Sequence, residues 1–112
     1  MKENKKKGTF VFVVNMGEGS WVKINDLEIL KRFSKVSAID LQLSFSGGNQ
    51  PTIAEAALFA EAVDKGWQIE KQYQQGISFF QIRILDLEKG KAQEVLDLAE
   101  EHFSLSPAAI LN

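Results

Sequence analysis

The most regular alternation of hydrophobic and polar positions lies in residues 36–45. Apolar side chains at positions 39, 41, 43 and 45 alternate with the polar Asp40, Gln42 and Ser44. Successive side chains of a strand point to opposite faces, so this period of two predicts a strand with one buried face. Residues 9–16 are apolar on both sides around Phe12. They predict a strand that is central in a sheet or covered on both faces.

Shorter patterns predict the remaining strands. Glycines at 17 and 19 predict a turn, after which a short strand would form a hairpin with the strand at 9–16. Gly76 suits a tight turn between two longer segments in which apolar and polar residues alternate. The predicted segments are 21–24, 67–73, 77–85 and, after the helix-breaking Pro107, a candidate edge strand at 108–111.

Helical spacing and start signals predict a first helix at 25–35 and a third at 87–103. Asn25 is a candidate cap for the first helix, with Glu28 three positions on, as in a capping box. Asp86 is a candidate cap for the third helix, whose apolar residues repeat at helical spacing.

A second helix is predicted at 52–65. Thr52 begins it with capping-box spacing, and Gly66 can adopt the left-handed conformation that ends a helix. Its apolar residues, Leu58 and Phe59 among them, occupy nearly every side of the helix. We therefore expect this helix to be buried on more than one side, by the sheet or by another subunit.

These elements predict an α+β fold, a two-layer sandwich of three helices on a mixed sheet of four to five strands. From about residue 36 their order is β-α-β-β-α-β, as in ferredoxin-like folds, preceded by an extra strand or hairpin and a helix. A three-layer α/β arrangement around a mixed sheet is the alternative. Residues 1–8 are expected to be a flexible basic tail, and 9–112 a single domain.

Composition narrows the classes of function. The chain of 112 residues is 45% apolar and has no cysteine, which excludes disulfides and thiol chemistry. Its net charge of -2 argues against nucleic-acid binding. No stretch has the ~20 apolar residues of a membrane helix, and no long apolar run follows the basic start. We expect a cytoplasmic protein without a cofactor.

Two loops are candidate binding sites. The first joins a strand to a helix start, where unpaired N–H groups attract anions, although it lacks the spacing of known phosphate-binding motifs. Its candidate ligand-binding residues are Ser46, Gly47, Gly48, Asn49 and Thr52. The second loop presents Trp21 beside glycines, and aromatic residues anchor protein partners. The candidate partner-binding residues are Trp21, Leu58, Phe59, Trp67 and Tyr73.

No motif carries catalysis. His102 is the only histidine, so no metal site with histidine or cysteine neighbours is predicted. The leading hypothesis is a non-enzymatic binding or regulatory module that acts through protein–protein contacts and forms a homo-oligomer, such as a dimer. A sensor of small ligands or anions at the 46–52 loop is the alternative. A third hypothesis is an enzyme that uses Asp40, Glu70, Asp86 or His102, although no spacing favours a pair.

Overall fold

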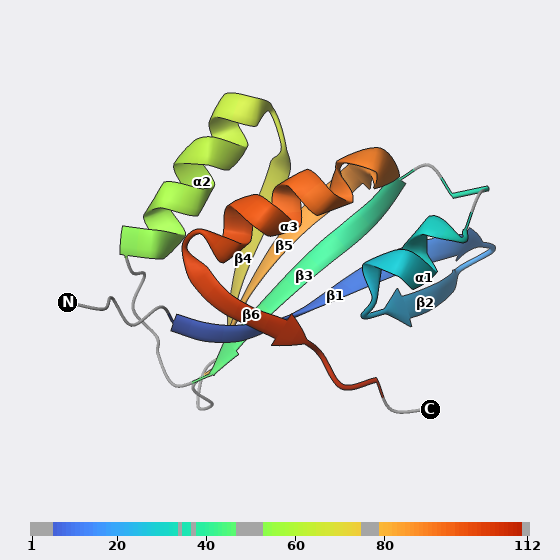
Figure 1. Cartoon of the computed structure of the whole chain (residues 1–112), viewed down its shortest axis with the longest axis horizontal. Helices are drawn as coiled ribbons and strands as arrows, with labels where there is room; N and C mark the ends of the chain where they lie inside the picture. The colour runs from blue at the N-terminus through green and yellow to red at the C-terminus, as the bar shows by residue number, and fades with distance from the viewer. Residues whose placement is uncertain (1–5, 34, 37, 47–52, 75–78, 111–112) are drawn as a thin grey trace.

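The structure is a computed structural model that describes residues 6–33, 35–36, 38–46, 53–74 and 79–110. Within these residues the chain forms one six-stranded sheet, three α-helices and a 3-10 turn (Figure 1). In chain order the elements are β1 (Lys6–Gly17), β2 (Ser20–Ile24), α1 (Leu27–Lys31), β3 (Ala38–Ser46), α2 (Ile53–Lys65), β4 (Gln68–Gln74), β5 (Phe79–Glu88), η1 (Lys89–Lys91), α3 (Ala92–Glu100) and β6 (Phe103–Pro107). The predicted α+β class with three helices is confirmed, and the sheet has one strand more than the four to five predicted.

The sheet is built around β1. β3 pairs with one edge of β1, and β2 and β6 share the other edge. β2 pairs with residues 12–17 of β1, and β6 pairs with residues 6–10. β5 and then β4 follow beyond β3, which gives the order β2-β1-β3-β5-β4. The pairing of β1 with β6 is parallel, and the other pairings are antiparallel.

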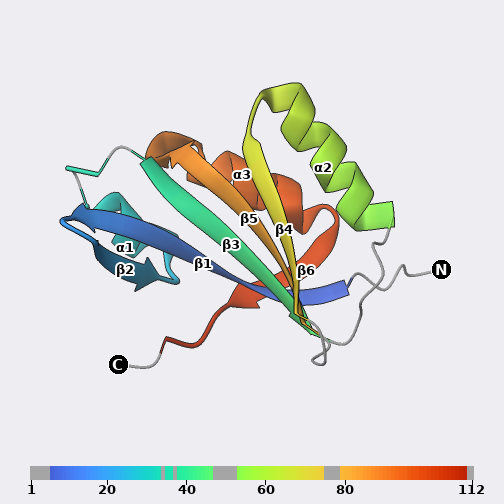
Figure 2. The same cartoon turned by 180° about the vertical axis from the view of Figure 1, so that it is seen from behind.

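The three helices lie on one face of the sheet. Figure 1 shows them in front of the strands, and Figure 2 shows the strands in front when the molecule is seen from behind. The packing agrees, because Leu30 of α1, Leu58 of α2 and Val95 of α3 belong to one core cluster with Phe12 and Leu41 of the sheet. The arrangement therefore has two layers, not the three of the alternative prediction. The other face of the sheet carries no helix of the described chain.

The ferredoxin-like sheet order is not confirmed, although the chain order from β3 to β6 is the predicted one. β1 occupies the place beside β3, and β6 pairs with β1 instead. β1 suits an inner position because both of its faces are apolar. Phe12 and Val14 are fully buried on the helix side, and Val11 and Val13 on the other face are only 7% and 8% exposed.

The first helix is shorter than the predicted 25–35 and has a different cap. The Asp26 side chain accepts a hydrogen bond of 2.8 Å from the Glu28 N–H, whereas Asn25 was predicted to cap. The Asn25 side chain instead donates to the Ala108 carbonyl at 2.7 Å. Asn25 therefore fixes the segment after β6, and the next residue caps α1.

The third helix also differs from the predicted 87–103. β5 continues to Glu88, where Leu87 pairs with Ile39, so Asp86 lies in a strand and caps no helix. Phe103 is the first residue of β6, and its ring packs against Phe45 with centroids 4.6 Å apart. The last strand therefore precedes the candidate segment 108–111, because parallel pairing with β1 begins at Phe103.

Strand β1 begins within residues 1–8, the segment that was predicted to be a flexible basic tail. Lys6, Lys7 and Gly8 belong to β1, because β6 supplies a parallel partner for them. Residues 1–5 of the predicted tail lie outside the described residues. Among the helices of the described chain, none is both long enough and apolar enough to span a membrane.

Gly8 provides a test of the packing between β1 and β3. A Cβ atom at this position would overlap the Phe45 ring and lie 2.9 Å from the Ser44 carbonyl oxygen. We expect Gly8→Ala to lower the free energy of unfolding by about 1–3 kcal/mol, as overpacking does. Gly90→Ala is the control, since its Cβ meets nothing within 4 Å. Urea unfolding compares the two, and equal effects would contradict this packing.

Candidate functional site

Helix α2 leaves one apolar side uncovered. Leu58 and Ala62 are fully buried against the sheet, whereas Ala56, Ala60 and Val63 are exposed. Val63 has 75% of its surface exposed, the largest value among the exposed large apolar residues. Positions 56, 60 and 63 follow the spacing that places residues on one side of a helix. We call these three residues the α2 outer face. The described chain buries this helix on one side only, so the expectation of burial on several sides is not met within the chain.

The end of α2 sets the direction of β4. Gly66 has a φ of 76°, which confirms the predicted left-handed stop. Its N–H donates to the Val63 carbonyl at 3.1 Å, and the Trp67 N–H donates to the Ala62 carbonyl at 2.9 Å. This pair of bonds is a Schellman motif, which closes the helix and starts β4 at once. α2 and β4 therefore lie at the same end of the molecule (Figures 1 and 2).

β4 forms an edge of the sheet. Within the described residues it pairs with β5 and with no strand on its other side. Its seven residues contain no proline, and an edge of this kind offers backbone N–H and C=O groups to another strand. An apolar helix side and an unpaired strand edge thus lie at one end of the domain.

Of the residues predicted to contact a partner, the structure describes the side chains of three, and it places Trp21 away from the other two. Leu58 is fully buried in the core cluster and faces the sheet, not solvent. Trp21 is 56% exposed, but it lies on β2, at the edge opposite β4. Trp67 is half-buried at the start of β4. The side chains of Phe59 and Tyr73 lie outside the described part of the structure.

Of the loop predicted to bind a ligand, only Ser46 is described, as the last residue of β3. Gly47, Gly48, Asn49 and Thr52 lie outside the described residues.

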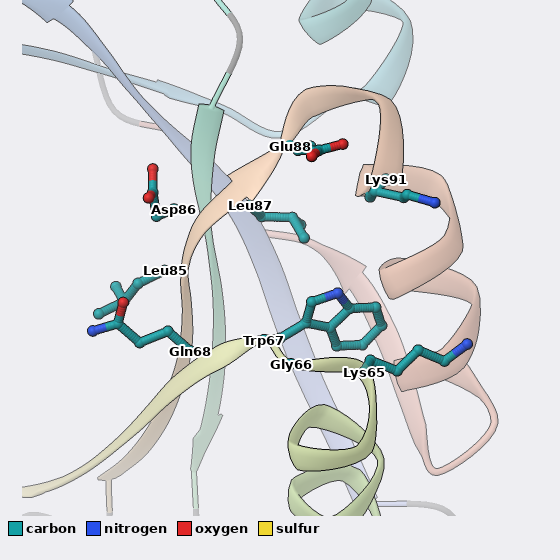
Figure 3. Close-up of a pocket in the computed structure, with 9 residues that line it drawn as sticks. All are labelled: Lys65, Gly66, Trp67, Gln68, Leu85, Asp86, Leu87, Glu88 and Lys91. Carbon is teal, nitrogen blue, oxygen red and sulfur yellow. The ribbon is translucent and has the colours of Figure 1, made fainter.

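A pocket of about 380 Å³ lies elsewhere, between the junction of α2 with β4 and the end of β5 (Figure 3). In Figure 3 the Trp67 indole points to the side on which Lys65 and Lys91 lie, and Leu87 lies above it. The lysines carry the positive charges of the pocket, and two carboxylates balance them. The lining residues are Lys65, Gly66, Trp67, Gln68, Leu85, Asp86, Leu87, Glu88 and Lys91.

A bulge in β5 shapes this pocket. The register between β3 and β5 shifts after Ile84, so that two residues of β5 lie opposite Asp40. Asp86 takes a φ of 52°, in the left-handed region that aspartate tolerates better than most residues. The Asp40 side chain accepts a hydrogen bond of 3.0 Å from the Asp86 N–H. The sequence contains no glycine or proline that would have marked this bulge.

The polar side of β3 lies on the uncovered face of the sheet. Asp40 and Glu70 each lie 3.6 Å from the Arg83 guanidinium, and Gln81 is hydrogen-bonded to Gln42 at 3.3 Å. Glu70 and Asp40 therefore neutralise a cation and do not form an acid–base pair with His102, which belongs to the helix side. Of the four residues in the enzyme hypothesis, Asp40 contacts both Arg83 and the Asp86 N–H, Glu70 contacts the same arginine, and His102 contacts Glu61 instead.

His102 has a partner that sequence reasoning missed. Its Nε2 lies 3.3 Å from Oε1 of Glu61, which is 41 residues away on α2. Glu101 joins this pair, because one ligand atom from each of the three residues lies within 4.8 Å of the others. The sequence places Glu101 next to His102, but Glu61 is one of several charged residues of α2, and no spacing indicates that it would contact His102.

Comparison with models of protein families, with curated proteins and with solved structures finds no match to this chain.

Asp40 tests the bulge beside the pocket. We expect Asp40→Ala to lower the free energy of unfolding by about 1 kcal/mol, because the Asp86 N–H loses its acceptor. Asp40→Asn keeps an oxygen that can accept this hydrogen bond, so it should lower the free energy of unfolding by less than Asp40→Ala does. Glu70→Gln removes the other, more exposed partner of Arg83 and should change stability by less than about 0.5 kcal/mol. Chemical denaturation measures all three, and a larger loss for Glu70→Gln would contradict this role of Asp40.

Proposed function

We propose that the protein is a non-enzymatic binding module that acts through protein–protein contacts, and that a second copy of the chain binds at the end formed by α2 and β4. The observation that carries the proposal is the α2 outer face. A single domain gains nothing by exposing Val63 beside Ala56 and Ala60, whereas an interface would bury these side chains.

The edge of β4 supports the same surface. The three side chains of the α2 outer face are small, and they would supply only part of the roughly 1,000 Å² that a stable interface buries. Pairing between two β4 strands would add main-chain hydrogen bonds and continue the sheet into the second copy. A two-fold axis beside β4 would then bring the two α2 helices together, which the small Ala56 and Ala60 allow.

Val63 is the residue with which to test this proposal. At tens of micromolar, we expect the natural chain to have twice the monomer mass of 12.5 kDa by light scattering. Val63→Glu should weaken the dimer at least tenfold, because a carboxylate would be buried without a partner. Its fold should not change, since Val63 is 75% exposed.

The matched control is Ile29→Glu, which introduces the same charge at a 41% exposed apolar residue on α1. This variant should dimerise as the natural chain does. A monomeric natural chain would overturn self-association. Equal weakening by the two variants would show that charge, and not the α2 outer face, controls assembly.

A second candidate function, the binding of a small anionic ligand, is favoured by the pocket at Trp67. Its volume of about 380 Å³ lies within the range of about 300–1,000 Å³ that is common for ligand sites. Lys65 and Lys91 both contact Glu94, at 3.4 and 3.7 Å, so an anion would have to compete with that carboxylate.

Thermal shift with nucleotides and pyrophosphate tests this candidate. A ligand at 100 times its dissociation constant stabilises the folded state by about 2.7 kcal/mol. Lys91→Ala should abolish the shift, and Lys31→Ala should retain it, because Lys31 forms a similar exposed ion pair far from the pocket. An equal shift in both variants would remove the pocket from consideration.

A further inference from the structure

Three metal-ligating side chains converge where α2 meets the turn between α3 and β6. Glu61 comes from α2, and Glu101 and His102 follow the end of α3. The imidazole Nε2 of His102 lies 3.3 Å from Glu61 Oε1, and the three residues each place a ligand atom within 4.8 Å of the other two. None of the three residues belongs to the α2 outer face or lines the Trp67 pocket.

We propose that Glu61, Glu101 and His102 bind one divalent transition-metal ion, with Zn²⁺ as the best fit. Ligand atoms about 2.0–2.1 Å from a tetrahedral ion are about 3.3 Å from one another, by the geometry of the tetrahedron. The separation of His102 and Glu61 already has this value. Glu101 is exposed, so its carboxylate can rotate toward the ion without disturbing the core.

The donor atoms select the class of metal. One imidazole nitrogen with two carboxylates suits Zn²⁺, Co²⁺ or Ni²⁺, whereas Mg²⁺ and Ca²⁺ prefer oxygen ligands alone. Two carboxylates balance the charge of a divalent ion. Three protein ligands leave a fourth position for water, as in zinc sites that are open to solvent.

Two of the three ligands are held in place by the fold. The His102 N–H donates to the Ala99 carbonyl at 3.0 Å, and the next residue, Phe103, is 1% exposed. Glu61 adjoins the fully buried Ala62 on α2. The backbone at these two ligands is therefore fixed before a metal binds, and only side chains would have to be ordered. The competing explanation is an ion pair between Glu61 and a protonated His102, which requires no metal.

The single histidine makes the test direct. The natural chain, without an affinity tag, is freed of metal by a chelator and titrated with Zn²⁺ while the imidazole protons are followed by NMR. With one histidine in the chain, these signals report on His102 alone. We expect a saturable shift that ends at one equivalent of Zn²⁺, one site by calorimetry, and no shift with Mg²⁺. An imidazole signal unmoved by excess Zn²⁺ would overturn the proposal and leave the ion pair.

Variants test whether Zn²⁺ binds at these three residues and not at other carboxylates of the surface. His102→Gln, Glu61→Gln and Glu101→Gln should each weaken Zn²⁺ binding at least tenfold, since the loss of an outer-shell partner alone costs 10–100-fold. Glu94→Gln, which removes an exposed carboxylate in the first turn of α3 that is paired with Lys65, should bind as the natural chain does. Glu101 is exposed, so Glu101→Gln keeps the test valid if a variant at the half-buried Glu61 or His102 fails to fold. Unchanged affinity in all three variants would overturn the proposal.

Discussion

The burial of both faces of β1 is the constraint on which the rest of the sheet depends. On the helix side, Phe12 and Val14 are covered by the core. On the other side no helix of the described chain covers Val11 and Val13, so neighbouring strands must shield them. Val13 lies between Lys23 of β2 and Asp40 of β3, and Val11 lies beside Gln42. These longer side chains reduce the exposure of the valines to 7% and 8%, which an edge position could not do.

The inner position of β1 displaces the strands around it. β6 cannot reach β3, so it pairs with the free half of the outer edge of β1, next to β2. The sheet extends in the other direction through β5 to β4, which becomes the far edge. α2 precedes β4 directly and is held there by the turn at Gly66, so it lies at the end of the helix layer. The uncovered side of α2 thus accompanies the edge position of β4.

The sequence was sufficient to predict the structure of those segments in which one local signal determines the conformation. The alternation in β3, the stop at Gly66 and the two-sided character of β1 were all predicted. Sequence-based prediction failed where a contact with a residue far along the chain determines the local structure. Asn25 did not cap α1 because Ala108, 83 residues away, takes its side chain. α3 begins late because Leu87 pairs with Ile39, and the bulge at Asp86 depends on the Asp40 carboxylate. Glu61 and His102 meet across 41 residues, a contact that no spacing could predict.

The position of α2 explains both the unusual composition of this helix and why its sequence pattern was difficult to interpret. A helix on the surface of a domain has one apolar and one polar side, and its pattern indicates which is which. α2 has three environments instead: Leu58 and Ala62 face the core, Ala56, Ala60 and Val63 face outward, and Glu61 faces the turn after α3. Two apolar sides leave little room for a polar one, so the sequence appeared apolar nearly all round. Among the charged residues of this helix that the structure describes, Glu61 is the one that lies where His102 and Glu101 converge.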